Sequence, residues 1–148
     1  MLRQLLVGIV VSVCNIAIHG LVMATVVQMS SQIAGTKTAV RLATRLIIVT
    51  IEAASIATVP VLMAAHFFEV MVWSLAYANF GVAPAGADPA YFAFVNYTTL
   101  GYGDVTPVVR WRLIGPITAM NGVLLFGWST ADIFEVLRRT DQKLRSAG

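Results

Sequence analysis

The chain has 148 residues, of which 58% are hydrophobic and only 11% are charged. About a quarter of the residues in an average soluble domain are charged, so this composition excludes a water-solvated globule. The same scarcity of charge excludes a disordered chain. A single cysteine, Cys14, excludes a disulfide-rich scaffold. The class that remains is an integral membrane protein with one domain.

The net charge of +3 does not indicate a nucleic-acid partner, because the basic residues cluster beside long apolar segments. One cluster contains Lys37, Arg41 and Arg45, and a second lies near the C-terminus (Arg138, Arg139, Lys143 and Arg145). Basic residues of this kind flank membrane spans on the cytoplasmic side. We therefore expect both clusters inside the cell, in contact with membrane lipids that include anionic headgroups.

The first apolar segment runs from Leu5 to Val27, about 23 residues, which is enough to span a bilayer with some tilt. It is longer than the core of a signal peptide, so a retained transmembrane helix is predicted. A polar linker follows it. Residues 1–38 are thus predicted to form an N-terminal transmembrane helix and a linker.

Residues 39–80 are almost continuously apolar and would measure roughly 63 Å as one helix, which is too long for a single perpendicular span. The first half carries a polar stripe that is typical of an amphipathic helix at the membrane interface. Pro60 is expected to bend the second half. Two separate spans are the alternative, but no turn-forming segment divides the region. The sequence favours one long, bent element.

Residues 81–89 are rich in Gly, Ala and Pro, which predicts a loop. The apolar stretch that follows is too short to cross a membrane. A last span is predicted within residues 111–138, and residues 139–148 are expected to form a short basic cytoplasmic tail. Near the end of this span, Asp132 and Glu135 are expected to form salt bridges between subunits. A ring of acidic side chains at the cytoplasmic end of the span is the less favoured alternative.

Between the short stretch and the last span lies a segment in which glycines alternate with larger residues, Thr98-Thr99-Leu100-Gly101-Tyr102-Gly103-Asp104. Glycine permits backbone conformations that are closed to other residues. Irregular backbone at membrane depth is tolerated only where protein or a water-filled cavity surrounds it. Its exposed carbonyl groups then need a partner, which a dehydrated cation supplies. The pattern predicts a re-entrant loop that binds cations.

The string YFAFVNYTTLGYGD at residues 91–104 resembles the pore helix and selectivity filter of potassium channels. The resemblance implies an all-α membrane protein that assembles as a homotetramer. Its permeant ion, K⁺, would be held by filter groups of Thr99, Leu100, Gly101 and Tyr102, with Gly103 at the outer end. The resemblance further implies that three residues support the filter: Tyr91, Thr98 and Asp104.

Three positions depart from the usual pattern of that family. Leu100 replaces the commoner valine, Asn96 stands where threonine is usual, and Val95 stands where some members have a carboxylate. Because the residue at position 100 acts through its carbonyl group, we expect the preference for K⁺ to survive. We expect the departures to affect the stability of the filter and the inactivation of the channel instead.

The resemblance organises residues 39–138 as one pore domain. Its parts are an outer helix, an outer loop, a pore helix with its filter, and an inner helix (39–80, 81–89, 90–104 and 111–138). The whole layout also resembles short bacterial potassium channels with one additional N-terminal helix. This implies a multi-pass protein of the bacterial inner membrane, the cell membrane, with its N-terminus outside and its C-terminus in the cytoplasm.

The last span contains further candidate functional residues. Gly122 and Gly127 match a spaced pair of inner-helix glycines, of which the first is the usual gating hinge in the similar channels. Asn121, Phe126 and Thr130 are candidates for the lining of a central cavity. For Asn121 a hydrogen bond between helices is the alternative, because membrane helices use such bonds as glue.

His66 and Glu69 are three residues apart on one predicted helix, at membrane depth. Ionisable groups in this position are costly and suggest a function, and a histidine beside a carboxyl group is suited to pH sensing. A hydrogen-bonded pair that docks the outer helix against the N-terminal helix near His19 is the favoured alternative. A metal site made by His19, His66 and Glu69 is a third, least favoured one.

The predicted function is passive, K⁺-selective conduction through a tetrameric pore. A weakly selective cation channel and a non-conducting membrane interaction subunit are the alternatives. No catalytic motif is present, so an enzyme is rejected, and no cofactor is expected besides the permeant K⁺. The predicted partners are three further copies of the chain and membrane lipids, with no nucleic acid. Gating control is expected from one of four sources: the membrane, protons, voltage across the filter, or a separate regulatory subunit.

Overall fold

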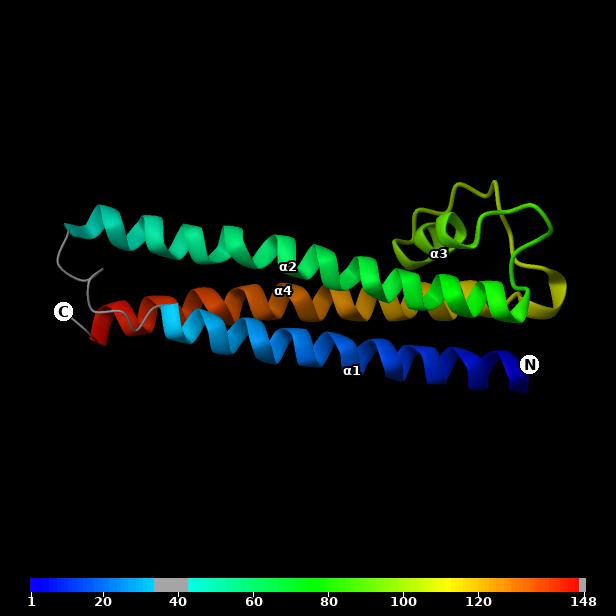
Figure 1. Cartoon of the computed structure of the whole chain (residues 1–148), viewed down its shortest axis with the longest axis horizontal. Coiled ribbons are helices and arrows are strands. Elements are labelled where there is room, and N and C mark those ends of the chain that lie inside the picture. Colours follow the sequence, from blue (N-terminus) through cyan, green and yellow to red (C-terminus); the bar gives the residue numbers. More distant parts are fainter. Residues whose placement is uncertain (34–42, 147–148) are drawn as a thin grey trace. The chain divides into compact units, whose positions relative to one another are not determined.

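The structure is a computed structural model that describes residues 1–33 and 43–146, with side chains for residues 1–28, 58–139, 141 and 142. Every regular element in these residues is helical (Figure 1). The elements are three long helices, one short helix and one 3₁₀ turn: α1 (Leu2–Ile33), α2 (Ala43–Phe80), α3 (Pro89–Tyr97), η2 (Val109–Trp111) and α4 (Ile114–Ser146).

Three segments of the described residues are long and apolar enough to cross a membrane. They are Leu2–Gln28, Thr58–Phe80 and Val109–Arg139. The chain is therefore a multi-pass membrane protein, and the predicted all-α fold class is confirmed.

The region predicted as one long outer element forms the single helix α2, which continues through Pro60. Proline removes one helical hydrogen bond, but helices in membranes tolerate it where neighbouring groups satisfy the backbone. The structure thus has one helix here in place of two spans. The side chains of the expected polar stripe, including Lys37, Arg41 and Arg45, lie outside the described residues.

Two helices extend beyond the ends that the sequence indicated. α1 continues to Ile33, and α4 continues to Ser146, so that residues 139–146 of the expected tail are helical. The carboxylate of Glu135 lies 2.8 Å from Arg138 and 2.5 Å from Arg139. The two arginines follow Glu135 by three and four positions, and ion pairs at these sequence separations stabilise a helix. Within the single chain both partners of Glu135 are on its own helix, and a salt bridge between subunits stays a prediction.

The described residues divide into two compact units. Unit 1 comprises Met1–His19 and Ala65–Gly127, and unit 2 comprises Gly20–Ala64 and Trp128–Gly148. In unit 2 the buried apolar residues include Met23, Val26, Leu62 and Val136. Unit 1 contains α3 and residues 98–104, which we call the filter segment, so it holds every residue of the site described below.

The core of unit 1 is an aromatic cluster at which α2, α3 and the start of α4 meet. It consists of Val70, Trp73, Tyr77, Val82, Phe92, Ala93, Tyr97, Trp111 and Ile114. Because lipid tails are as apolar as these side chains, close packing and hydrogen bonds between helices hold such a unit together. One such bond joins Tyr77 to Thr118, with 2.7 Å between the two hydroxyl oxygens.

The part of α1 that belongs to unit 1, up to His19, packs onto the same core. The Arg3 guanidinium lies over the rings of Phe80 and Trp111, 5.9 and 5.4 Å from their centroids. The side chain of Gln4 accepts a hydrogen bond of 2.8 Å from the backbone N–H of Leu113. The N-terminus therefore lies at the end of unit 1 where α2 ends and the loop of residues 81–89 begins (Figure 1).

At Gly122 the backbone of α4 lies directly against the end of α3. A Cβ atom added at this glycine would lie 2.1 Å from the carbonyl oxygen of Tyr97, the last residue of α3. Backbone atoms cannot yield as a flexible side chain can, so the position requires glycine. α4 runs as one helix through Gly122 and Gly127, and the hinge role of the two glycines stays a prediction.

We predict that Gly122→Ala lowers the free energy of unfolding by about 1–3 kcal/mol, the range for overpacking a closely packed site. Gly127→Ala is the matched control, because no heavy atom of the described residues lies within 4 Å of its added Cβ. Alanine there should be neutral or stabilising by up to about 1 kcal/mol, since glycine is the weaker helix former. Unfolding of both purified variants in detergent measures the difference. Equal stability of the two would contradict the close approach of α3 and α4.

Candidate functional site

The filter segment begins directly after α3, and its backbone alternates in handedness. Thr99, Gly101 and Gly103 have φ angles of +59°, +58° and +80°, whereas Leu100 and Tyr102 between them keep negative φ. When left-handed and right-handed residues alternate, successive peptide groups point in the same direction. Their carbonyl groups can then line one side of the segment. Glycine adopts left-handed values readily. The structure therefore explains why glycines occupy positions 101 and 103.

Thr99 is the one non-glycine residue with positive φ among those described. A left-handed backbone at such a residue costs on the order of 1–3 kcal/mol and persists only where the surroundings impose it. Here the backbone N–H groups of Thr99 and Leu100 donate to the carbonyls of Asn96 and Val95, at 3.1 and 3.0 Å. The end of α3 thus fixes the strained start of the filter segment.

The start of α3, like its end, is fixed by specific contacts. Pro89 occupies the first turn, and the carboxylate of the N-cap residue Asp88 accepts a hydrogen bond of 2.8 Å from the N–H of Ala90. Asp before Pro is a strong helix-start signal, because the side chain satisfies a backbone donor and proline lacks one. α3 therefore has fixed boundaries at both ends, which sets the direction in which the filter segment leaves it.

Asp104, at the far end of the filter segment, is braced by α3. The Tyr91 hydroxyl donates a hydrogen bond of 2.6 Å to the carboxylate of Asp104. This bond raises the pKa of the Tyr91 phenol above its usual value. The contact with Tyr91 is thus consistent with the filter-supporting role that the resemblance implies for Asp104.

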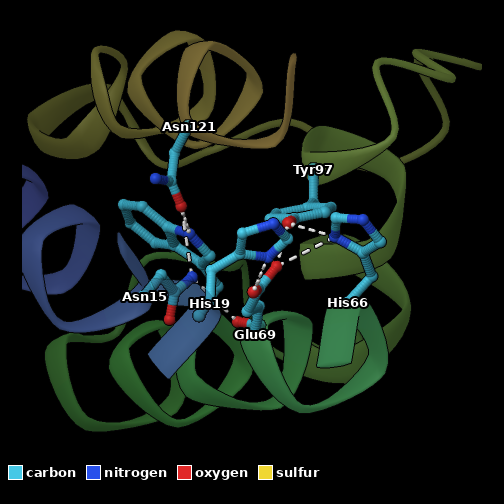
Figure 2. Close-up of polar contacts among 7 residues, drawn as sticks. Asn15, His19, His66, Glu69, Tyr97 and Asn121 are labelled. Atoms are coloured by element: carbon cyan, nitrogen blue, oxygen red, sulfur yellow. Dashed lines mark hydrogen bonds and ion pairs between the residues drawn. The ribbon is translucent and has the colours of Figure 1, made fainter. Parts of the chain in front are cut away.

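The carboxyl group of Glu69 is the centre of a buried network at the base of the filter segment (Figure 2). The Nδ1 atoms of His19 and His66 lie 2.8 and 2.9 Å from its two oxygens, and the Tyr97 hydroxyl donates to the oxygen that faces His66. Glu69, His19 and Tyr97 are wholly buried. The network joins α1, α2 and α3, so the favoured interpretation of His66 and Glu69 as a docking pair agrees with the structure.

A second set of hydrogen bonds continues from this network to α4. The Asn15 amide donates to the backbone carbonyl of Glu69 at 3.2 Å and to the side-chain oxygen of Asn121 at 3.1 Å, and the Trp73 indole donates to the same oxygen at 3.0 Å. Asn121 is 3% exposed. Of the two roles predicted for Asn121, the hydrogen bond between helices is the one for which the structure shows direct contacts.

The other two cavity candidates are exposed on the surface of the chain. Phe126 is 39% exposed, and its ring centroid lies 4.4 Å from that of His66 and 5.5 Å from that of Tyr97. Thr130 is also exposed and belongs to unit 2. A cavity-facing role for these two residues stays a prediction.

Several residues of the site were not singled out from the sequence. Asn15, Trp73 and the anchoring role of Tyr97 were missed. A signal existed in α1, where Asn15 and His19 are polar residues four positions apart in an otherwise apolar span, and this spacing places them on one helix face. Polar groups facing a common side of a membrane helix indicate a partner helix.

A family model described as an ion channel matches residues 46–139, more than half of the chain. The chain belongs to this ion channel family. The match covers most of α2, all of α3, the filter segment and α4 to Arg139, and it leaves α1 outside. No curated protein and no solved structure matches the chain. Membership of an ion channel family agrees with the lack of a catalytic motif.

For this ion channel we predict that Tyr97→Phe lowers the free energy of unfolding by about 1–3 kcal/mol, the range for withdrawing a donor from a buried polar group. Tyr77→Phe is the matched control. Both tyrosines are wholly buried, but Tyr77 pairs with the neutral hydroxyl of Thr118, so its loss should cost only about 0.5–1.5 kcal/mol. Denaturant unfolding in detergent compares the two. A smaller loss for Tyr97→Phe than for Tyr77→Phe would contradict the anchoring role of Glu69.

Proposed function

We propose that four copies of the chain form a K⁺-selective pore through which K⁺ moves passively down its gradient. The observation that carries the proposal is the alternating backbone of Thr99, Gly101 and Gly103, in an exposed segment that α3 holds in place. The filter segment of one chain, lined by its carbonyl groups, would supply one wall of a K⁺-binding site. Three further copies around a common axis would complete each ring of oxygens.

The exposed side chains of the filter segment support assembly with further copies. Leu100 is 51% exposed and Tyr102 is 70% exposed in the single chain. In a tetramer, neighbouring subunits would cover these apolar and aromatic groups. The carbonyls of residues 99–102 and the Thr99 hydroxyl would then replace the hydration shell of K⁺, and ions would advance by knock-on between adjacent sites.

The proposed orientation places the mouth of the filter and the N-terminus outside the cell. Supporting this, Arg3 packs at the end of α2 that leads into the loop of residues 81–89, so Met1 and this loop lie at one end of unit 1. The basic residues at the end of α4 would then face the cytoplasm, as the positive-inside rule requires. The proposed location is the cell membrane.

Flux measurements on the purified protein in liposomes test this proposal. We expect K⁺ flux that barium blocks, with little Na⁺ flux under the same gradient. Comparable K⁺ and Na⁺ fluxes would contradict K⁺ selectivity and favour a weakly selective cation channel. An absence of flux would contradict conduction and favour a membrane interaction subunit.

We further predict that Gly101→Ala abolishes K⁺ flux, because a Cβ atom disfavours the φ of +58° that the filter segment needs at this position. Gly86→Ala is the matched control. Gly86 has a φ of +83° and open space around its added Cβ, but it lies in the loop before α3. The backbone strain is therefore similar at the two sites, and only Gly101→Ala should lose flux. Equal effects of the two substitutions would contradict a specific role for the filter backbone.

A further inference from the structure

We propose that His19, His66 and Glu69 form a binding site for a divalent transition-metal ion of the zinc class. A metal ion bound there would link α1 to α2 beside the last residue of α3. The site involves α1, which lies outside the part of the chain that matches the ion channel family. The metal site itself is independent of K⁺ conduction, and only its effect on flux rests on the proposed function.

The three side chains already converge on one point. One ligand atom from each residue lies within 4.8 Å of the other two, and Figure 2 shows the two imidazole rings on either side of the Glu69 carboxyl group. A tetrahedral zinc ion with ligands at about 2.0–2.2 Å separates neighbouring ligand atoms by roughly 3.3 Å. The present nitrogen-to-oxygen distances of 2.8 and 2.9 Å would have to open by about 0.5 Å, and separations of up to 4.8 Å within the group would have to close by up to about 1.5 Å. Rotation of the three side chains would have to supply both changes.

The donor set favours a transition metal over the ions that are abundant in a cell. Two imidazoles and one carboxylate are a set that binds zinc with one coordination position left open. Calcium and magnesium prefer oxygen ligands alone, whereas imidazole nitrogen suits zinc, copper and nickel. K⁺ passing through a ring of carbonyl groups would therefore not compete for this site.

Neighbouring side chains hold the candidate ligands in place, and of the three ligands only His66 is partly exposed. The backbone carbonyl of Glu69 accepts a hydrogen bond from Asn15, and the His66 ring packs on Phe126 at 4.4 Å between centroids. His19 and Glu69 are wholly buried, but the side chain of His66 is 13% exposed. A metal ion would therefore approach from the side of His66.

Metal binding would compete with the anchor of Tyr97. The Tyr97 hydroxyl donates to Oε2 of Glu69, the same oxygen that faces His66. A metal ion on this oxygen would displace the hydroxyl and release the residue that precedes the filter segment. If the chain conducts K⁺ as proposed, zinc should therefore reduce the flux.

Zinc binding to the purified full-length protein in detergent tests the site directly. Titration calorimetry should give one Zn²⁺ per chain, with His66→Asn and His19→Asn each weakening binding by at least about tenfold, the effect that loss of an outer-shell partner alone can reach. Every protein in these titrations also carries the Cys14→Ser substitution, because Cys14 is an exposed thiol that could bind zinc itself. Tyr97→Phe is the matched control, since it keeps all three ligands and removes the competing hydroxyl; it should bind zinc at least as tightly.

Gel filtration of each variant verifies that it is folded before titration. No saturable binding in the Cys14→Ser protein, or binding that the two folded histidine variants leave unchanged, would overturn the metal site. Zinc binding in a protein without K⁺ flux would contradict the proposed function and leave the site standing. K⁺ flux in a protein that binds no zinc would overturn the metal site and leave the proposed function standing.

Discussion

The buried carboxyl group of Glu69 is the constraint on which the arrangement of unit 1 depends. An ionisable group at membrane depth is costly unless other groups of the protein satisfy it. Here α1 provides His19, α2 provides His66, and α3 provides the hydroxyl of Tyr97. Because α1 and α3 each contribute a partner to a group on α2, their positions along α2 are set together. A shift of α1 or α3 along α2 would break one of these two contacts.

The same contacts fix the start of the filter segment. Tyr97 is bound through its hydroxyl to Glu69, and its carbonyl oxygen lies against Gly122 of α4. The residue is thus held from both sides, and the strained, left-handed Thr99 follows two positions later. At the other end, Tyr91 holds Asp104 by a hydrogen bond of 2.6 Å. An ion pathway lined by backbone carbonyls needs such support, since the backbone between the two anchors forms neither helix nor sheet.

Sequence patterns indicated the spans and the filter segment because both depend on local properties. A long apolar run shows a membrane helix, and the alternation of glycines in residues 98–104 shows an unusual backbone. The bonds of the network were not foreseeable in this way. His19 meets Glu69 across 50 positions and Asn15 meets Asn121 across 106, and hydrophobic periodicity does not say which polar residues of separate helices face each other. For Gly122 the resemblance suggested a hinge, whereas the structure adds a close contact that only a three-dimensional arrangement reveals.

The central claim is that the filter segment binds K⁺ in preference to Na⁺. A ligand that binds the folded state alone raises its melting temperature. The most direct measurement is therefore the melting temperature of the purified, assembled protein in KCl and in NaCl of equal concentration. The account predicts a higher melting temperature in KCl, whereas equal values in the two salts, or a higher value in NaCl, would contradict it.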